Sequence, residues 1–412
     1  MVGGGAAGFF CAVNAARMHP GLKVVLLEKT SKLLSKVKVS GGGRCNVTHA
    51  LFDIGEMSRR YPRGQNFVKR SFHNFFTTDT IEWFRTRGVK LKAEEDGRMF
   101  PVTDSSQTII DCLMNEANMY GVEIRMNAEV RQVKVENAKF IVSIGSQQPT
   151  ANSQQLSADF ICIACGGYPK ASMFQWLLDL GHAIAEPVPS LFTFNLPKHP
   201  ITALMGVSVD RARVKIGGSK LVEEGPVLIT HWGLSGPAVL RLSAWGAREL
   251  ETRGYRFRAQ VNWLPEFNEQ TLKSKLQEFR GSASSKKITG LNFGGLPNRL
   301  WLLLLQESGI GEEMRFAELP ARQENALIKN IVDYTVEVSG KTTYKEEFVT
   351  AGGINLAEVD AHTMMSKKHP NLFFAGEILD VDGITGGFNF QHAWTSGWIA
   401  AKSVGEKVKG EG

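Results

Sequence analysis

The sequence has few cysteines and no long apolar run. Its 412 residues include five cysteines, which are too few and too scattered for a disulfide framework. No apolar stretch approaches the roughly 18 residues that a membrane span needs. The apolar start also lacks the basic segment and the small-residue cleavage site of a signal peptide. These absences favour a protein of the reducing cytoplasm and argue against a membrane partner.

The chain also lacks an excess of acidic residues. Lys and Arg together number 48 and Asp and Glu 41, which gives a net charge of +7 and a pI near 9.1. This balance is compatible with an anionic partner such as a nucleotide, a phosphorylated substrate or RNA. An ordinary solvated basic surface is the alternative. The length predicts two or three domains.

Glycine is abundant, and the first cluster has a meaningful spacing. Residues Gly3 to Gly8 fit the pattern G-x-G-x-x-G. A helical pattern follows and stops at His19-Pro20-Gly21, and Lys23–Leu27 is an apolar run that is typical of a buried strand. Glu28 ends that run, twenty residues after Gly8. This order predicts a dinucleotide-binding unit.

Each residue of this pattern has an expected role. Gly3 permits the tight turn, Gly5 lets the backbone approach a pyrophosphate, and Gly8 lets the helix pack closely on the strand. The helix start offers free N–H groups and a positive dipole end to the phosphates. Glu28 is expected to accept hydrogen bonds from the adenosine ribose.

Only Met1 and Val2 precede these glycines, although the first strand of such a unit is central. Two residues cannot form it. We therefore hypothesise that the physiological start lies several residues upstream and that this chain is N-terminally shortened. Mass spectrometry of the native protein tests this, since a mature N-terminus at Met1 would contradict it.

Three further glycine clusters stand along the chain. Ser40–Asn46 reads SGGGRCN, where the glycines let backbone amides approach a ligand and Arg44 adds a fixed charge; a flexible surface loop is the alternative. Ile161–Gly167 reads as a buried strand that runs into a glycine turn. Leu372–Gln391 reads as another strand with a glycine-rich loop, and a helical pattern follows at His392–Lys402.

Together these residues resemble the FAD-binding fold of glutathione-reductase-like flavoproteins. More narrowly, the chain is similar to the BaiN-like family of bacterial flavoproteins, also called aminoacetone oxidase family FAD-binding enzymes. Cys165 and Met365 depart from the family pattern, which has Thr and commonly Glu at these positions. The motifs that carry the resemblance are Ser40–Asn46 with Thr48, Glu95–Arg98 with Phe100–Pro101, Thr230–Pro237, Thr350–Gly353 and Gly376–Gln391.

The resemblance implies an α/β fold. We expect a Rossmann-type FAD-binding domain, interrupted by a β-rich barrel-like domain that itself carries a small helical subdomain. The expected boundaries are 1–187 with 345–412 for the FAD-binding domain, 188–265 with 333–344 for the β-rich domain, and 266–332 for the helical subdomain. The polar run at 145–157 predicts a hairpin or loop.

The glycine pattern and the resemblance also imply a set of FAD-binding residues. No metal is expected, because a lone C-x-x-C is not a zinc site. No second G-x-G-x-x-G follows a strand, so NAD(P)H, if it is the reductant, visits transiently. The predicted FAD-binding residues are Gly3, Gly5, Ala6, Ala7, Gly8, Glu28, Lys29, Lys36, Ser40, Gly41, Gly42, Arg44, Cys45, Asn46, Val130, Ala164, Cys165, Gly166, Gly376, Glu377, Asp380, Gly386, Gly387, Phe388 and Asn389.

Two residues are candidates for proton transfer. Cys45 lies among glycines expected to touch the flavin and is either a proton donor or a packing residue. His231 lies in a glycine- and proline-rich loop, and an imidazole titrates near neutrality. Cys162-x-x-Cys165 is either a redox dithiol or, as a strand motif favours, a pair of buried cysteines. Asp380 and Asp382 are expected to orient ribityl hydroxyls or to hold their loop.

A basic segment, Arg59–Arg63 followed by Lys69–Arg70, is interleaved with Tyr61, Phe67 and Phe72. Such a mixture predicts a surface that binds RNA phosphates and stacks its bases. The alternative is a helix with one charged and one apolar face.

We therefore predict an FAD-dependent oxidoreductase that transfers hydride through the flavin. Three substrates compete. The first is a uridine in large-subunit ribosomal RNA, reduced to dihydrouridine. The second is a small enone such as a steroid or bile-acid intermediate, and the third is a small amine oxidised by oxygen. A flavin-binding protein without enzyme activity is the last alternative, no DNA partner is expected, and the oligomeric state is open.

Overall fold

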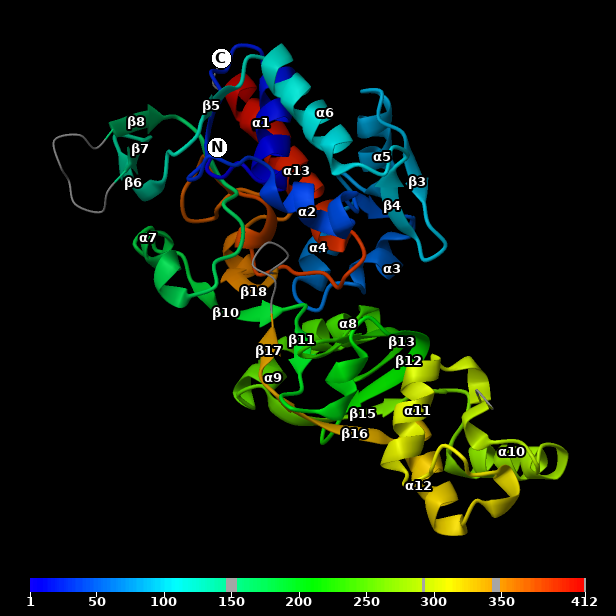
Figure 1. Ribbon diagram of the computed structural model, residues 1–412. Coiled ribbons are helices and arrows are strands. Elements are labelled where there is room, and N and C mark those ends of the chain that lie inside the picture. The colour runs from blue at the N-terminus through cyan, green and yellow to red at the C-terminus, as the bar shows by residue number, and fades with distance from the viewer. Residues whose placement is uncertain (146–153, 291–292, 343–348, 411–412) are drawn as a thin grey trace. The chain divides into compact units, whose positions relative to one another are not determined.

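The computed structural model describes residues 1–145, 154–290, 293–342 and 349–410 (Figure 1). They form two compact units, unit 1 from Met1–Ser190 with Tyr344–Gly412 and unit 2 from Leu191–Thr343. The predicted loop at 145–157 falls largely on 146–153, and the predicted return near 345 falls on 343–348; both segments lie outside the described residues. Within the described ranges, no helix is both long and apolar enough to cross a membrane.

Unit 1 is built on a short parallel sheet. Strand β1 (Val25–Leu27) pairs with β5 (Glu123–Arg125), and β9 (Ile161–Ile163) pairs with β19 (Leu372–Phe374). Val2 bridges Leu27 on one side and Ile163 on the other, so it lies between the two strand pairs. The start of the chain thus takes the central place that the glycine pattern requires of its first strand.

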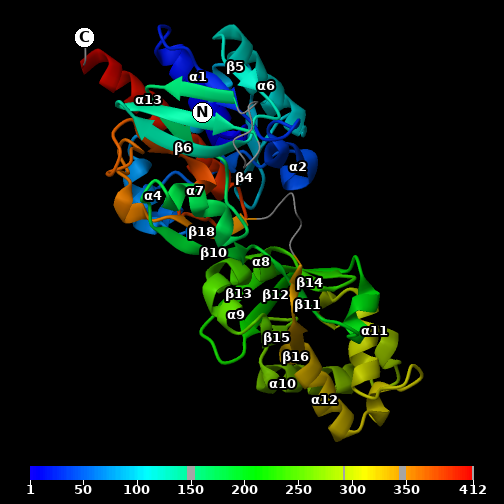
Figure 2. The same cartoon turned by 90° about the vertical axis from the view of Figure 1, so that its left-hand side faces the viewer.

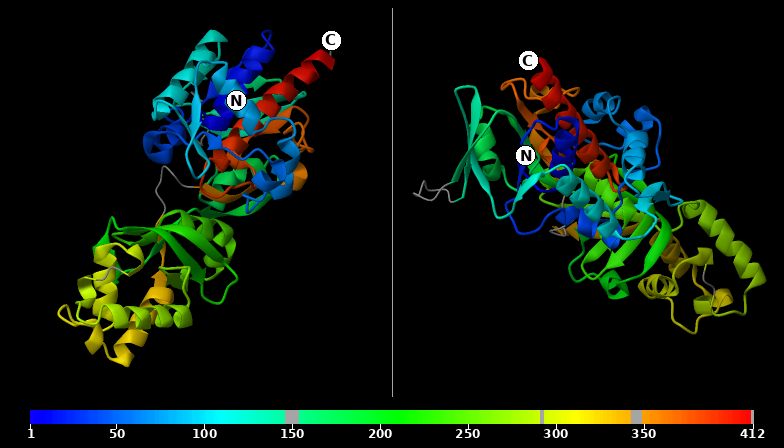
Figure 3. Two further views of the ribbon diagram at one scale, coloured as in Figure 1. Left: turned by 90° about the vertical axis from the view of Figure 1, so that its right-hand side faces the viewer. Right: turned by 90° about the horizontal axis from the view of Figure 1, so that it is seen from above.

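Two helices pack tightly behind this sheet. Helix α1 (Ala6–Met18) carries buried apolar residues along most of its length, because it lies between the sheet and α13 (Phe388–Gly410). Figure 3 shows α1 and α13 side by side, in blue and red. Gly397 allows the close crossing, since a Cβ there would lie 2.6 Å from the Ala7 carbonyl oxygen. The helix and strand predicted after Gly8 are confirmed as α1 and β1.

Smaller elements surround this core. Figure 2 shows the antiparallel sheet of β6, β7 and β8 in teal, in which β6 pairs with β7 and β7 with β8. The elements of unit 1 not yet given are α2 (Ser35–Gly43), β2 (Thr48–His49), α3 (Ile54–Ser58), α4 (Gln65–Ser71), α5 (Thr77–Arg85), β3 (Leu91–Ala93), β4 (Arg98–Pro101), α6 (Ser106–Met119), β6 (Val130–Glu136), β7 (Lys139–Ile144), β8 (Gln154–Ala158), α7 (Gln175–Leu178), β10 (Ile184–Ser190) and β18 (Val349–Ile354).

Unit 2 contains an antiparallel seven-stranded sheet in the order β16-β15-β12-β13-β14-β11-β17. The two edge strands are consecutive in the chain, because β17 follows β16 after Gly340. The sheet therefore curls round so that both edges meet in one stretch of chain, which explains the predicted barrel-like character. Its strands are β11 (Thr193–Asn195), β12 (Ser208–Ile216), β13 (Val222–Thr230), β14 (Gly233–Ser235), β15 (Arg256–Asn262), β16 (Tyr334–Ser339) and β17 (Lys341–Thr342).

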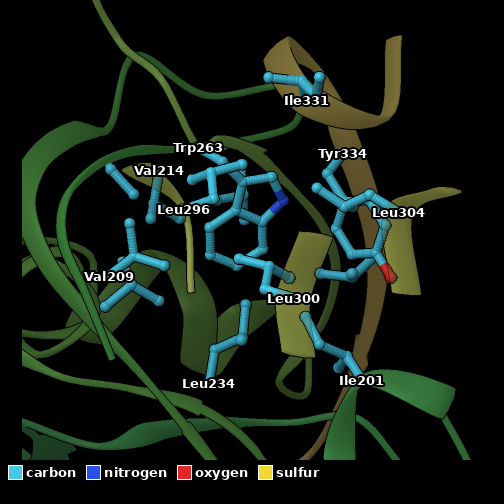
Figure 4. Close-up of a cluster of buried hydrophobic side chains, with 14 of the residues drawn as sticks. Ile201, Val209, Val214, Leu234, Trp263, Leu296, Leu300, Leu304, Ile331 and Tyr334 are labelled. Carbon is cyan, nitrogen blue, oxygen red and sulfur yellow. The ribbon is translucent and has the colours of Figure 1, made fainter. Parts of the chain in front are cut away.

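The helices of unit 2 share one apolar core with the sheet (Figure 4). Trp263 and Tyr334 of the sheet region pack with Leu300 and Leu304 of α11 and with Ile331 of α12. Burying such a leucine contributes about 1.5–3 kcal/mol, so the helical segment is stabilised by the sheet it covers. The helices are α8 (Pro237–Trp245), α9 (Ala247–Thr252), α10 (Glu269–Ser282), α11 (Asn298–Glu307) and α12 (Ala321–Val332).

Candidate functional site

The first glycine turn is shaped by contacts with a distant strand. Gly3 has φ +106°, and a Cβ there would lie 2.5 Å from the Ala164 carbonyl oxygen and 2.6 Å from the Cα of Cys165. A Cβ at Gly8 would lie 2.0 Å from the Gly3 carbonyl oxygen. Any larger residue at Gly3 or Gly8 would push the turn away from the strand end. The structure thus brings the first and third glycine clusters together.

The N-terminus of α1 faces open space. Gly5 is the N-cap, no side chain caps the helix, and its first turn carries no acidic residue. Apart from the neighbours of Gly5 in the chain, no described residue has an atom within 4 Å of the position that a Cβ of Gly5 would take. The first-turn N–H groups at Ala6 and Ala7 have no partner within the helix, and the positive dipole end is concentrated there. This end of the helix therefore fits the pyrophosphate of a dinucleotide.

Glu28 is held against this turn. Its Oε2 accepts a hydrogen bond from the Gly4 N–H (2.9 Å), and its Oε1 accepts from the N–H and the hydroxyl of Thr30 (both 2.8 Å). The Ala128 N–H donates to the Glu28 carbonyl, which brings the start of β6 and its Val130 into this region. The carboxylate thus ends its strand beside the glycine turn, as the spacing predicts; Lys29 next to it is exposed.

The C-terminal glycine cluster returns to the same helix. A Cβ at Gly376 would lie 2.7 Å from the Cβ of Ala7. Glu377 Oε1 accepts from the Thr350 N–H (2.8 Å), and its Oε2 pairs with Lys36 Nζ (2.6 Å). The buried Thr350 hydroxyl has no hydrogen-bond partner in the described part of the chain. Sequence reasoning left Thr350 out of the site, although it had singled out the motif that begins there.

A second glycine site joins the segment 40–49 to the start of α13. The Asn46 side chain, oriented to satisfy both neighbours, donates to the Thr48 carbonyl (2.9 Å) and accepts from the Gly387 N–H (3.0 Å). Asn389 holds the preceding loop, because its amide accepts from the Gly383 N–H (2.8 Å) and donates to the Gly383 carbonyl (2.9 Å). Both asparagines therefore position backbone around the helix start.

His49 belongs to this second site and was missed by sequence reasoning. Its Nδ1 lies 2.9 Å from the Gly386 carbonyl oxygen, and its ring stacks on Phe388 at a centroid distance of 4.7 Å. Gly97 leaves room for the ring, since a Cβ there would lie 2.5 Å from Nε2. Burial lowers the pKa of His49, which favours the neutral imidazole. The sequence offered one signal for His49: it directly follows Thr48, which belongs to the motif Ser40–Asn46 with Thr48.

Arg44 is oriented by neighbours on the small β2–β4 sheet. Ser40–Gly42 depart from helical backbone, which ends the regular part of α2. The Arg44 guanidinium lies 4.0 Å from the centroid of the Phe100 ring and pairs with Glu94. The hydrogen bond to Glu94 raises the pKa of Arg44, so its charge is balanced within the protein.

The five cysteines are free thiols. Cys45 is fully buried with φ +62°, and burial raises its pKa to about 12, so its thiol is protonated at neutral pH. Cys162 is buried in β9, and its proximity raises the pKa of the buried Cys11 of α1. Cys165 is only half-buried and lies two residues beyond the end of β9. The buried strand position of Cys162 supports the buried-strand interpretation over the dithiol.

His231 belongs to unit 2, whereas all the predicted FAD-binding residues belong to unit 1. It is exposed on the turn between β13 and β14, and its ring centroid lies 3.6 Å from that of Trp232. The Thr230 hydroxyl accepts from the Gly233 N–H (3.2 Å) and donates to its carbonyl (3.0 Å), which fixes the turn. The catalytic assignments of His231 and Cys45 stay predictions.

Asp382 holds the loop before α13. It is fully buried, forms a two-pronged ion pair with Arg63, and accepts from the Ser190 hydroxyl (2.8 Å). Burial raises the pKa of Asp382, and the Arg63 charge opposes that rise. Asp380 anchors the same loop through its N–H, which donates to the Ile354 carbonyl (3.1 Å).

The predicted base-stacking surface is wrong in its aromatic part. Tyr61, Phe67 and Phe72 are all buried, so none can stack on a nucleic-acid base. Tyr61 instead donates its hydroxyl to the Phe388 carbonyl (2.6 Å). The apolar residues of this segment form core, and its cations other than Arg63 are exposed, which agrees with the alternative interpretation.

Comparison with known proteins identifies the family. The model of the HI0933-like protein Rossmann domain matches residues 1–403. The chain belongs to this family. A relative from Escherichia coli, named ribosomal RNA dihydrouridine synthase, is 30% identical over 98% of this chain and 97% of its own. A relative from Clostridium scindens, named 3-dehydro-bile acid delta(4,6)-reductase, is 27% identical over 99% of this chain and 98% of its own.

Solved structures share the fold at low identity. A flavocytochrome c3 fumarate reductase matches with a TM-score of 0.51 and 16% identity, over 98% of this chain and 77% of that one. A 3-ketosteroid-delta4-(5alpha)-dehydrogenase from Rhodococcus jostii matches with a TM-score of 0.50 and 12% identity, over 97% and 95%. The predicted Rossmann-type FAD fold is confirmed, and the protein is an FAD-dependent oxidoreductase.

Proposed function

We propose that this oxidoreductase reduces the activated C=C bond of a uracil base in large-subunit ribosomal RNA, giving dihydrouridine. NAD(P)H is the proposed reductant. The observation that supports flavin chemistry is the uncapped N-terminus of α1 beside the open face of Gly5. The RNA substrate is supported by the Escherichia coli relative, which aligns over nearly the full length of both chains.

Different residues of unit 1 would bind different parts of FAD. The α1 turn would hold the pyrophosphate, and Glu28 would face the ribose beside it. Lys36, Glu377 and the segments 40–46 and 386–389 would hold the flavin end. FAD supplies hydride transfer when bound. The first turn of α13 carries the positive end of the helix dipole and would stabilise negative charge that develops nearby.

Reduction of a C=C bond also requires a proton. Cys45 is a candidate because its thiol is protonated at neutral pH, and it lies one residue before Asn46, which binds the start of α13. His231 is the other candidate, as an exposed imidazole on a fixed turn. A positioned acid accelerates such a step by about 10²–10⁴-fold.

A small enone is the second candidate substrate. The Clostridium scindens relative is named a reductase of a bile acid, and it also aligns over nearly the whole chain. A conjugated enone and a uracil ring both present a C=C bond polarised by a carbonyl group, so one site chemistry serves either.

Nucleoside mass spectrometry of large-subunit ribosomal RNA tests the proposal. A strain without this gene should lose dihydrouridine, and the wild-type gene should restore it. If dihydrouridine is unchanged, the RNA substrate is wrong, and NAD(P)H oxidation by the pure protein with a steroid enone then tests the second candidate.

The flavin site has its own test. In Gly5→Val the new Cβ has no atom of a described residue beyond the turn within 4 Å, and the side chain fills the space at the α1 N-terminus, so the purified variant should lose its flavin absorbance while keeping its melting temperature. Gly21→Val is the matched control, because Gly21 also faces open space and is far along the chain from the turn. Equal flavin content in both variants would overturn the assignment.

A further inference from the structure

A stretch of unit 1 carries positive charge without any acid. Between Glu56 and Asp79 the sequence has no Asp or Glu, although it holds Arg59, Arg60 and Arg63 and the pair Lys69–Arg70. Five cations without an acid give this stretch a local excess of positive charge, whereas the whole chain holds 48 cations and 41 acids. The structure shows which of these charges remain available.

The fold sorts the segment into a buried side and an exposed side. Phe67 and Val68 of α4 are buried. The buried rings of Tyr61 and Phe72 pack against each other, with their centroids 5.8 Å apart. Arg63 turns inward to the buried Asp382.

Four cations stay outside. Arg59, Arg60, Lys69 and Arg70 are exposed, and none of them forms an ion pair with any residue that the structure describes. We call these four residues the cationic face. Their charges are therefore free to meet an external anion.

The cationic face is fixed beside the start of α13. The Ile384 N–H donates to the Arg60 carbonyl (3.0 Å), and Tyr61 donates to the Phe388 carbonyl (2.6 Å). A backbone bridge joins Arg63 to Asp382. These bonds connect the segment to the loop that carries Gly386 and Gly387, which the proposed function places at the flavin.

We propose that the cationic face binds the phosphate backbone of the RNA strand that presents the target base. This inference rests on the proposed function and names where its substrate docks. Four unpaired cations provide an electrostatic contact that does not depend on base sequence, because phosphates repeat along the strand. The buried aromatics leave charge, and not stacking, as the source of binding.

The test measures RNA binding separately from catalysis. The probe is an unmodified large-subunit ribosomal RNA fragment transcribed in vitro, bound to the FAD-loaded protein over a range of salt concentrations. The variants are Arg59→Ala with Arg60→Ala, and Lys69→Ala with Arg70→Ala. Lys134→Ala with Lys273→Ala is the control, since both lysines are exposed, form no ion pair with a described residue and lie far along the chain from the cationic face.

Each double variant should weaken RNA binding about tenfold at low salt and reduce the slope of log K against log salt by about 1 for each cation removed. Flavin content and melting temperature should not change. The control should bind as the wild type does.

The outcomes separate the two ideas. If the double variants keep the wild-type affinity and salt slope while the wild type forms dihydrouridine, the cationic face is wrong and the proposed function stands. If the wild type binds RNA through these cations but forms no dihydrouridine, the docking surface stands and the substrate is wrong. If the control loses as much affinity as the variants, binding is diffuse and the inference is overturned.

Discussion

The sheet of unit 2 and the cationic face of unit 1 use arginine in opposite ways. On the sheet of unit 2, Arg211 and Arg213 both pair with Glu224, and Arg258 pairs with Glu337, all at the surface. In unit 1 the four residues of the cationic face form no ion pair with any acid among the described residues. The comparison shows that a net charge of +7 does not tell which cations can bind an external anion, because local ion pairs with Asp and Glu neutralise some cations and leave others unpaired.

Burial makes the same distinction within unit 1. Arg63 lies only a few residues from Arg60, yet it is mostly buried and bound to Asp382, which has no exposed surface. An inward arginine holds the loop before α13, whereas the side chains of its exposed neighbours Arg59 and Arg60 form no ion pair with a described residue. We therefore expect substitutions of buried groups to cost stability and substitutions of exposed groups to cost function.

The two proton-donor candidates give the largest test of this contrast. His231 is exposed and Cys45 is buried. We expect His231→Gln to lower the rate of product formation about 10²–10⁴-fold with an unchanged melting temperature. Cys45→Ala should instead lower stability and leave the rate per bound flavin within a few-fold of the wild type. A large rate loss in Cys45→Ala alone, at full flavin content, would instead identify Cys45 as the proton donor.

Breaking the buried ion pair should cost the most stability. Asp382→Ala removes the carboxylate that balances the mostly buried Arg63 charge, which costs about 3–5 kcal/mol. Denaturant unfolding measures this difference. Arg63→Met with Asp382→Leu is the matched double variant and should recover much of the loss, since it removes both charges. If Asp382→Ala unfolds at the wild-type denaturant concentration, the loop does not depend on this pair.

The buried His392 should make the stability of the protein depend on pH. His392 is fully buried in α13, and burial lowers its pKa to about 4. The unfolded chain binds the proton near pH 6.5 and the folded one only near pH 4, so stability falls as pH drops through that window, by about 3 kcal/mol at most. His392→Gln should flatten this slope in unfolding experiments from pH 7 to 4. An unchanged slope would assign the pH dependence to other groups.

The smallest effect is expected at the surface of unit 2. Glu337→Ala removes the partner of Arg258, and both side chains are about 70% exposed. Solvent screens such a pair, so the loss should stay below about 1 kcal/mol in denaturant unfolding. The same substitution leaves Arg258 without this ion-pair partner and so also tests the cationic face. If Glu337→Ala raises the affinity for RNA as strongly as the cationic-face variants lower it, then RNA binding does not depend on the position of the cations beside α13.

The sequence by itself determined the features that depend on local chemistry. Gly3, Gly5 and Gly8 with Glu28 predicted the turn, helix and strand that the structure contains, because glycine spacing and apolar runs act over a few residues. The buried strand predicted to begin at Ile161 likewise became strand β9. The FAD fold followed from these motifs and from the resemblance they carried.

Only the tertiary structure decided which side of the chain each residue shows. It buried Tyr61 and Phe72, turned Arg63 inward, and placed His49 against Gly386. These outcomes depend on partners up to several hundred residues away, and apolar burial selects among them without a local signal. Sequence spacing fixes which groups are present, whereas packing fixes which of them remain free to react.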